Sequence, residues 1–254
     1  MWIDTHVHLN DKRLYASWKE IVNRAKEKRV NKFFVVGYDI NSSQIAVELS
    51  ENDDIYATIG LHPHESDKFE FNKKEWDKLL TSKVIAIGEI GLDYYKLYSS
   101  KDSQKQIFTQ FIQYAKENKL PIVIHSRDAW KDLIDIMKAE KVWEIGGIMH
   151  SFSGSYEIAK IIADWNFLFS FSGPITYPNA NNLRDVVRKL PLDLIAIETD
   201  APYLPPQSIR GKINEPAYLP EIAQKISEIK GIDLIDLSDI IKKNLKRIFK
   251  NIAI

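Results

Sequence analysis

The sequence predicts an α/β fold, a (β/α)₈ TIM barrel with one extra C-terminal helix. Three observations lead to this prediction. Short β-branched runs alternate with longer amphipathic runs, as in βαβ units. Eight runs of the first kind can be counted, and 254 residues then give about 32 residues for each unit. No linker, low-complexity segment or internal repeat interrupts the pattern, so we expect residues 1–254 to form a single domain.

The eight β-branched runs are the predicted strands. They span residues 2–8, 32–37, 55–60, 84–89, 121–125, 147–150, 167–170 and 194–199. Amphipathic patterns between them predict helices at residues 17–29, 42–51, 101–118, 129–140, 156–164, 182–189 and 218–230. A last amphipathic stretch, residues 237–249, predicts the extra helix.

A doubly wound open sheet is the alternative architecture. It would usually carry a glycine-rich, phosphate-binding turn after its first strand. Here the first strand ends in the sequence HVHLN, residues 6–10, instead. The barrel is therefore favoured, and in a barrel the active site lies at the C-terminal ends of the strands.

The composition excludes several classes of protein. With 44% hydrophobic and 28% charged residues, the chain is typical of soluble globular proteins. Its 35 basic and 35 acidic residues exclude a generally basic coat, although not a local basic cleft. The absence of cysteine excludes disulfides, thiolate zinc sites and cysteine nucleophiles. No signal-peptide pattern or membrane-length apolar run is found, so we expect a cytoplasmic protein without membrane contact.

All six histidines fall at or just beyond the predicted C-terminal end of a strand. They are His6, His8, His62, His64, His125 and His150. Such ends meet at one rim of a barrel. Because side chains alternate along a strand, His6 and His8 point to the same face and can reach one metal ion.

Two carboxylates end further strands, Glu89 on the fourth and Asp200 on the eighth. Together with His6, His8, His125 and His150 they make six candidate ligands. Six exceeds the three or four protein ligands of one catalytic zinc and suits two divalent ions, with Glu89 between them. The nitrogen and oxygen donors suit Zn²⁺, Mn²⁺ or Fe²⁺, and Mg²⁺ less naturally. Asp200 could also accept the proton of the attacking water.

The roles of three neighbouring residues stay open. Glu198 and Asp4 face the barrel interior by strand alternation, where each could orient a ligand or be a satisfied core residue. His64 follows Pro63 and is expected to be a surface loop residue.

Several residues at the same rim are candidates for substrate binding. His62 is expected to contact a phosphate or the water network. Arg127 and Arg210, with Lys212, are cations that could stabilise a phosphodiester oxyanion. Tyr203, like Tyr94 and Tyr95, could stack a base or pack a loop.

Seven separated blocks resemble, in order, the TatD-like metal-dependent DNase family of amidohydrolase-type barrels. They are DTHVHL from residue 4, GLHPHE from 60, GEIGLDYY from 88, IHSRDA from 124, HSFSGS from 150, ETDAPYL from 198 and RGKINEP from 210. The departures are Ser151, where cysteine is common, Ser66, where alanine is common, and Ile213, where a polar or basic residue is common. None of the three is a candidate ligand.

The resemblance implies a divalent-metal-dependent deoxyribonuclease of the 3′–5′ exonuclease type, acting on single-stranded DNA or 3′ ends. Water activated by two ions, Mg²⁺, Mn²⁺ or Zn²⁺, would cleave the phosphodiester, with Asp200 and Glu89 as catalytic residues. The resemblance assigns one ion to His6, His8, Glu89 and Asp200 and the other to Glu89, His125 and His150. Some relatives carry a carbamylated lysine on the fourth strand, where this chain has Glu89.

Other functions stay open from the residues alone. A metal pair would equally serve an amidohydrolase or phosphotriesterase-like enzyme acting on a small ester or cyclic amide, or a hydrolase of an aminoacyl ester on RNA. A non-catalytic metal-binding scaffold is a further alternative. Glu89 and the cations Arg127, Arg210 and Lys212 favour the nuclease.

Overall fold

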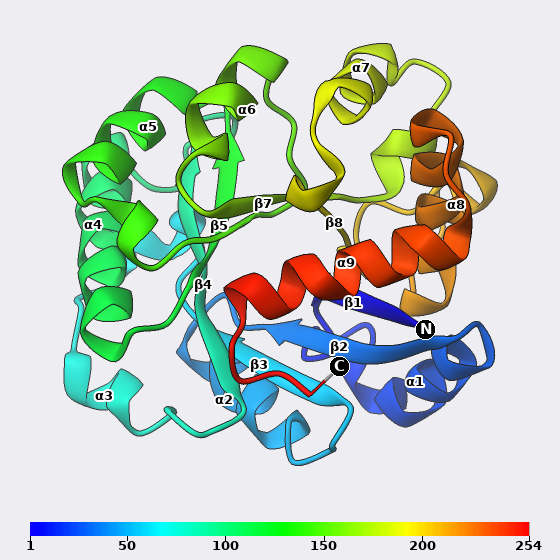
Figure 1. Cartoon of the computed structure of the whole chain (residues 1–254). Helices are drawn as coiled ribbons and strands as arrows, with labels where there is room; N and C mark the ends of the chain where they lie inside the picture. Colours follow the sequence, from blue (N-terminus) through cyan, green and yellow to red (C-terminus); the bar gives the residue numbers. More distant parts are fainter. Residues whose placement is uncertain (254) are drawn as a thin grey trace.

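Eight parallel strands form one barrel in the computed structural model, which describes residues 1–253 (Figure 1). The strands are β1 (Trp2–Val7), β2 (Val30–Val36), β3 (Ile55–Ile59), β4 (Val84–Asp93), β5 (Ile122–Arg127), β6 (Gly147–Met149), β7 (Phe167–Phe171) and β8 (Ile195–Ile197). Each strand pairs in parallel with the next one along the chain. The predicted (β/α)₈ fold is therefore confirmed.

The residues just beyond β8 close the barrel against β1. The backbone N–H of Asp200 donates to the carbonyl of His6 at 2.9 Å, and that of His8 donates to the carbonyl of Ala201 at 2.7 Å. Val7 and Ala201 form a parallel bridge between the same two segments. These bonds hold two predicted ligand histidines beside Asp200.

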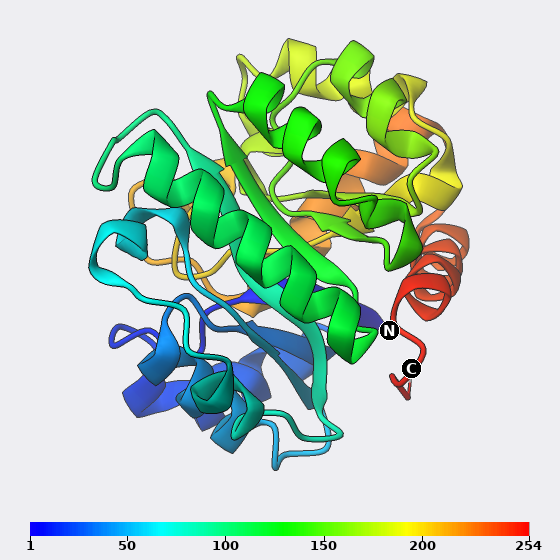
Figure 2. The same cartoon turned by 90° about the vertical axis from the view of Figure 1, so that its left-hand side faces the viewer.

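Helices surround the strands, and α4 crosses the front of the barrel in Figure 2. They are α1 (Trp18–Glu27), α2 (Ile40–Leu49), α3 (Lys73–Asp77), α4 (Lys101–Asn118), α5 (Trp130–Ala139), α6 (Tyr156–Ala163), α7 (Asn181–Lys189), α8 (Leu219–Lys230) and α9 (Leu234–Ile248). The predicted helix at residues 101–118 has the bounds of α4, and the ends of the other predicted helices differ by at most three residues. None of the helices described between residues 1 and 253 is long and apolar enough to cross a membrane.

Two of these strands and helices differ from the prediction by more than three residues or were not predicted at all. Strand β4 continues four residues beyond Glu89, the predicted end, to Asp93. Gly91 in this stretch disfavours a strand by propensity, but it permits close strand contact, because a Cβ there would lie 2.0 Å from the His125 carbonyl oxygen. Helix α3 was not predicted, since its five residues are too few to show a helical period; it buries Trp76.

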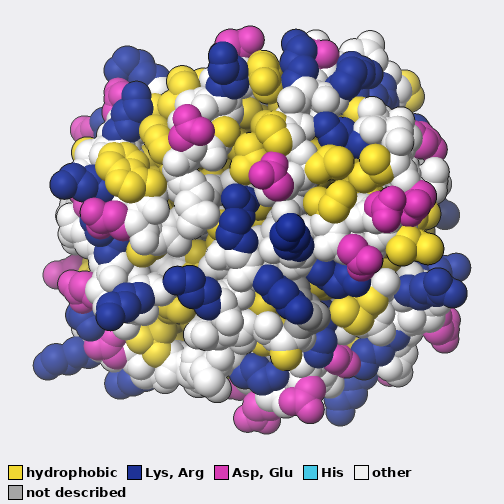
Figure 3. All heavy atoms as spheres, in the orientation of Figure 1, with side chains coloured by type: hydrophobic (Ala, Val, Ile, Leu, Met, Phe, Trp, Pro, Cys, Tyr) yellow, Lys and Arg dark blue, Asp and Glu magenta, His cyan; other side chains and the backbone are white. Residues whose placement is uncertain are grey.

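Helix α9 covers the N-terminal end of the barrel. The Asn244 side-chain amide donates to the carbonyls of Leu192 and Ile195 at 2.8 and 2.9 Å, next to the start of β8. The Phe249 ring packs against Phe34 of β2, with centroids 5.2 Å apart. This end shows lysine and arginine side chains and, among the residues described, no histidine (Figure 3). The predicted site therefore lies at the opposite end of the barrel.

Replacing the buried Asn244 tests how strongly α9 is held. In Asn244→Leu the carbonyls of Leu192 and Ile195 lose their donor inside the protein, so we expect a loss of about 2–3 kcal/mol of unfolding free energy. Urea unfolding followed by circular dichroism measures it. The control is Lys243→Leu, the same new side chain at the neighbouring exposed position. Equal stability of the two variants would contradict this role for Asn244.

Candidate metal centre

The predicted ligands converge at the C-terminal end of the barrel. A cavity of about 710 Å³ opens there, and five of the six line it: His8, Glu89, His125, His150 and Asp200. The sixth, His6, is fully buried and stacks on the His150 ring, with centroids 3.8 Å apart. Residues in or just beyond strands β1, β4, β5, β6 and β8 thus meet at one place, as expected for strand ends on one rim.

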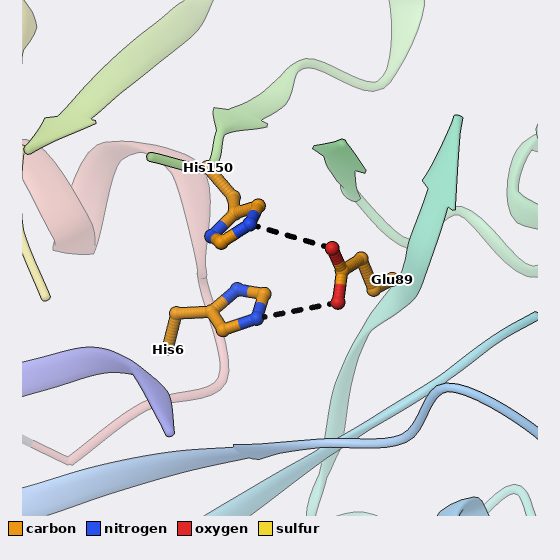
Figure 4. Close-up of side chains that lie close together, drawn as sticks. All are labelled: His6, Glu89 and His150. Atoms are coloured by element: carbon orange, nitrogen blue, oxygen red, sulfur yellow. Dashed lines mark ion pairs between the residues drawn. The ribbon is translucent and has the colours of Figure 1, made fainter. Parts of the chain in front are cut away.

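Glu89 lies at the centre of this group, with its two oxygens facing different strands (Figure 4). One oxygen, Oε2, is 3.4 Å from His6 Nε2. The other, Oε1, is 2.9 Å from His125 Nδ1 and 3.3 Å from His150 Nε2. A carboxylate placed in this way can bind two cations, one through each oxygen.

On the β1 side, nitrogen atoms face each other and two carboxylates. His6 Nε2 and His8 Nε2 are 3.2 Å apart. Asp200 Oδ1 lies 3.5 Å from the His8 nitrogen and 3.8 Å from that of His6. Each neutral imidazole has one nitrogen with a free lone pair, which can bind a metal ion. A group of such nitrogens beside carboxylate oxygens therefore fits a divalent cation better than it fits a network of hydrogen bonds alone.

On the β5 side, Glu89 shares its second oxygen with three imidazoles. His62 Nε2 is 3.8 Å from Oε1, in addition to His125 and His150. Groups of possible ligand atoms within 4.8 Å of one another are His6–Glu89–His150, His6–His8–Asp200 and His62–Glu89–His125. The structure therefore brings together all the ligands implied by the family resemblance and places His62 beside them.

The carboxylates of the centre favour positive charge on their neighbours. Burial lowers the pKa of His150, but Glu198 and Glu89 outweigh it and raise the pKa to about 10. Burial raises the pKa of Glu89, but His150, His125 and His6 hold it well below its usual value. Burial also raises the pKa of Asp200. The nearby histidines His8, His150 and His6, of which His8 has the largest effect, lower that pKa overall. An electrostatic environment of this kind is suited to bound cations.

Three of the ligand histidines are held through their second ring nitrogen. His150 Nδ1 is 2.7 Å from Glu198 Oε1, which also accepts from the Ser151 backbone N–H at 2.8 Å. His125 Nε2 is 3.0 Å from Asp93 Oδ2, and His8 Nδ1 is 3.1 Å from the Val36 carbonyl. Such contacts fix the ring orientation and raise the basicity of a metal ligand.

The two interior carboxylates left open by the sequence have different surroundings. Glu198 orients His150, as described above. Asp4 instead accepts from the backbone N–H of Thr199 at 2.9 Å and from its hydroxyl at 2.5 Å, which ties β1 to the segment after β8. Burial raises the pKa of Asp4 to about 7.

The predicted substrate contacts divide into two sets. His62, Arg127 and Tyr203 line the cavity, and Tyr95 does so as well. Arg210 is not among the described lining residues, and its guanidinium stacks over the Tyr177 ring at 4.5 Å.

Sequence reasoning missed two residues of the centre. His64, expected on the surface, lines the cavity with Nε2 3.2 Å from Asp93 Oδ2. Asp93 was part of a matching block but was not assigned a role, although it holds His125. The available signal was its spacing: Asp93 follows Glu89 by four residues on one strand, which gives both side chains the same face.

Comparisons with known proteins agree with the resemblance read from the sequence blocks. Residues 3–250 match the family model described as TatD related DNase. The metal-dependent hydrolase YabD of Bacillus subtilis is 43% identical over 253 residues, covering 98% of this chain and 99% of YabD. The metal-dependent hydrolase YcfH of Escherichia coli K12 is 33% identical over 253 residues, covering 97% of this chain and 95% of YcfH. The crystal structure of YjjV, a TatD homologue from Escherichia coli K12, gives a TM-score of 0.90 at 28% identity, covering 98% of both chains.

The contact between Glu198 and His150 can be tested through metal affinity. We expect Glu198→Gln to keep the fold but to weaken Mn²⁺ or Zn²⁺ binding about tenfold to a hundredfold, because the His150 ring loses its charged acceptor. Titration calorimetry on chelator-stripped protein measures the affinity. Glu221→Gln, the same change at an exposed position of α8, is the control. An affinity unchanged in Glu198→Gln would show that Glu198 only fills the core.

Proposed function

Since this chain belongs to the TatD-related DNase family and is a metal-dependent hydrolase, we propose that it cleaves the phosphodiester bonds of DNA as a 3′–5′ exonuclease. One observation carries the proposal. Glu89, which lies between two groups of histidines, lines a cavity that Arg127 and His62 also line. This places candidate metal ligands next to donors for a phosphate.

The family resemblance assigns the residues that would hold the ions. His6, His8, Glu89 and Asp200 would bind one divalent ion, and Glu89, His125 and His150 the other. When bound, the ions supply the Lewis acidity that activates water and balances the charge of the phosphate. Zn²⁺ and Mn²⁺ suit the imidazoles best, with Mg²⁺ as a third candidate.

Asp200 is the residue that we assign as general base. Its lowered pKa keeps the carboxylate ionised at neutral pH, and the side chain reaches the cavity. The backbone N–H of Asp200 donates to His6, and its carbonyl accepts from the Tyr203 N–H at 2.8 Å. These bonds fix the backbone that carries the carboxylate, which we assign to take a proton from the attacking water.

His62 and Arg127 are assigned to the phosphate oxygens. The pKa of His62 is lowered to about 3 by burial and by the nearby His125, so the ring is neutral at physiological pH. The His64 backbone N–H donates to His62 Nδ1 at 3.2 Å. The ring proton must then be on Nε2, which makes this atom a hydrogen-bond donor toward the centre. Arg127 adds a permanent charge at the mouth of the cavity.

The dimensions of the cavity favour a strand end. About 710 Å³ is within the range of small-molecule sites and suits a terminal nucleotide better than an internal segment of duplex. The same volume suits a small ester or cyclic amide, or the aminoacyl end of an RNA, which are the alternative substrates. The histidine and carboxylate ligands do not distinguish these reactions, so the substrate must be tested directly.

The direct test is a time course on 3′- and 5′-end-labelled single-stranded DNA. We expect chelator-stripped protein to be inactive and added Mn²⁺, Mg²⁺ or Zn²⁺ to restore stepwise loss of nucleotides from the 3′ end. Asp200→Asn should retain the fold, but its turnover should be at least about a hundredfold slower, since it lacks the base. Elemental analysis of each sample establishes its metal content.

Asp135→Asn, the same change at an exposed position of α5, is the matched control and should cleave like the unaltered protein. Absence of DNA cleavage by metal-loaded protein would contradict the proposal. Parallel assays with a lactone and an aminoacyl-RNA would then identify which alternative ester is hydrolysed.

Salt dependence gives a second test of the DNA substrate. If Arg127 and Lys96, which both line the cavity, each bind one phosphate, two counterions are released and log(kcat/KM) should fall with log[salt] with a slope of about −1.4. Steady-state cleavage of an oligonucleotide between about 50 and 200 mM salt measures the slope. The Arg127→Gln variant should show about half of it. A kcat/KM independent of salt would exclude phosphate binding by these cations.

A further inference from the structure

We infer that the connection between β4 and α4, residues 94–100, is a stacking surface for a nucleobase of the substrate strand. We call this segment the tyrosine loop. This rests on the proposed DNA substrate and specifies that the loop binds a base of that substrate. Figure 2 shows the connection beside the start of α4, at the end of the barrel opposite the chain termini.

Two of the three tyrosines in the tyrosine loop are exposed, whereas Tyr94 is partly buried and its hydroxyl donates to Asp132 at 2.9 Å. Tyr95 is 57% exposed and Tyr98 is 64% exposed, and both line the cavity above the candidate metal centre. Leu97 between them is also 57% exposed. Large apolar side chains that gather at the surface beside a cavity are characteristic of binding sites.

Cations accompany both rings. The Arg127 guanidinium carbon lies 3.9 Å from the centroid of the Tyr95 ring, and Lys96 Nζ lies 5.9 Å from that of Tyr98. Rings for bases next to cations for phosphates are the two components of sites for single-stranded nucleic acid. In a duplex the base faces are already stacked, so an unpaired end fits this surface better.

The base of the tyrosine loop is fixed although its tip is exposed. Buried Gln104 accepts from the Asp93 backbone N–H at 2.8 Å and donates to the carbonyls of Asp93 and Ser99 at 3.0 and 2.9 Å. The Ser99 hydroxyl donates to the His64 carbonyl at 2.7 Å. Because both ends of the loop are tied to the barrel, little conformational entropy is lost when a ligand binds to it.

Asp93 joins the tyrosine loop to the candidate metal centre. Its Oδ1 accepts from the backbone N–H groups of Tyr95 and Lys96 at 3.0 and 3.3 Å. Its Oδ2 lies 3.0 Å from His125 Nε2. On the same side, the His64 ring meets Tyr98 edge to face, with centroids 4.8 Å apart. The two tyrosines therefore lie where a base close to the cleaved bond would reach them.

The experiment measures the coupling between each tyrosine and each base. Single-stranded oligonucleotides carry one abasic tetrahydrofuran residue at each of the three positions nearest the 3′ end in turn, and kcat/KM is compared with that of the intact strand. We expect one abasic position to lower kcat/KM about tenfold in the unaltered protein, the value of one lost stacking contact. In Tyr98→Ala or Tyr95→Ala the intact strand should already be cleaved that slowly, and the abasic residue should add little further loss.

Phenylalanine variants distinguish stacking from a merely structural role. Tyr95→Phe and Tyr98→Phe keep a ring and should retain the discrimination against the abasic strand. The control is Trp143→Ala, which removes an aromatic side chain that is 42% exposed in the connection before β6, at the other end of the barrel. It should cleave both strands like the unaltered protein. Circular dichroism checks that every variant is folded.

The outcomes separate this inference from the proposed function. If the unaltered protein cleaves intact and abasic strands equally, or if the alanine variants slow both strands by the same factor, the tyrosine loop does not stack a base. The nuclease function would survive either result. If metal-loaded protein cleaves none of the strands, the DNA substrate is wrong and the stacking surface is rejected with it.

Discussion

A carboxylate buried among imidazoles is the interaction on which the centre of this protein depends. Glu89 is almost fully buried, and the removal of a charge from water is costly unless opposite charge or hydrogen bonds compensate for it. Nitrogen atoms of His6, His125 and His150 provide this compensation within 3.4 Å. The three histidines lie at the ends of different strands, and the barrel brings these ends together around one carboxylate. The burial of Glu89 therefore depends on the barrel, which brings the compensating histidines to it.

The surrounding structure maintains that geometry through polar contacts just outside the centre. Glu198 fixes His150, and Asp93 fixes His125 while also organising the tyrosine loop. Asp4 ties β1 to the segment that carries Asp200. These residues contribute no candidate ligand atom to the groups around Glu89. They instead hold in position the residues that contribute candidate ligand atoms. Contacts of this kind make a metal centre rigid before its ions and substrate bind.

Much of this arrangement could be predicted from the sequence because strand ends share one rim. His6, Glu89, His150 and Asp200 each lie at or just beyond the predicted C-terminal end of a strand, and the barrel topology brings such positions together. What could not be predicted depends on side-chain directions in loops. Arg210 has the residue type expected at a phosphate site, yet it is not among the described residues that line the cavity. His64 was expected on the surface, but its ring contacts Asp93 and its carbonyl accepts a hydrogen bond from Ser99 of the tyrosine loop. Local sequence contains no signal for either contact.

We propose that two metal ions share Glu89. Elemental analysis of purified, metal-saturated protein after removal of free ions tests it most directly, with Glu89→Gln and His150→Ala prepared in the same way. We expect two equivalents in the unaltered protein, one in His150→Ala and fewer than one in Glu89→Gln, with native circular dichroism throughout. A single equivalent in the unaltered protein that Glu89→Gln retains would contradict it, since no ion would then depend on the shared carboxylate.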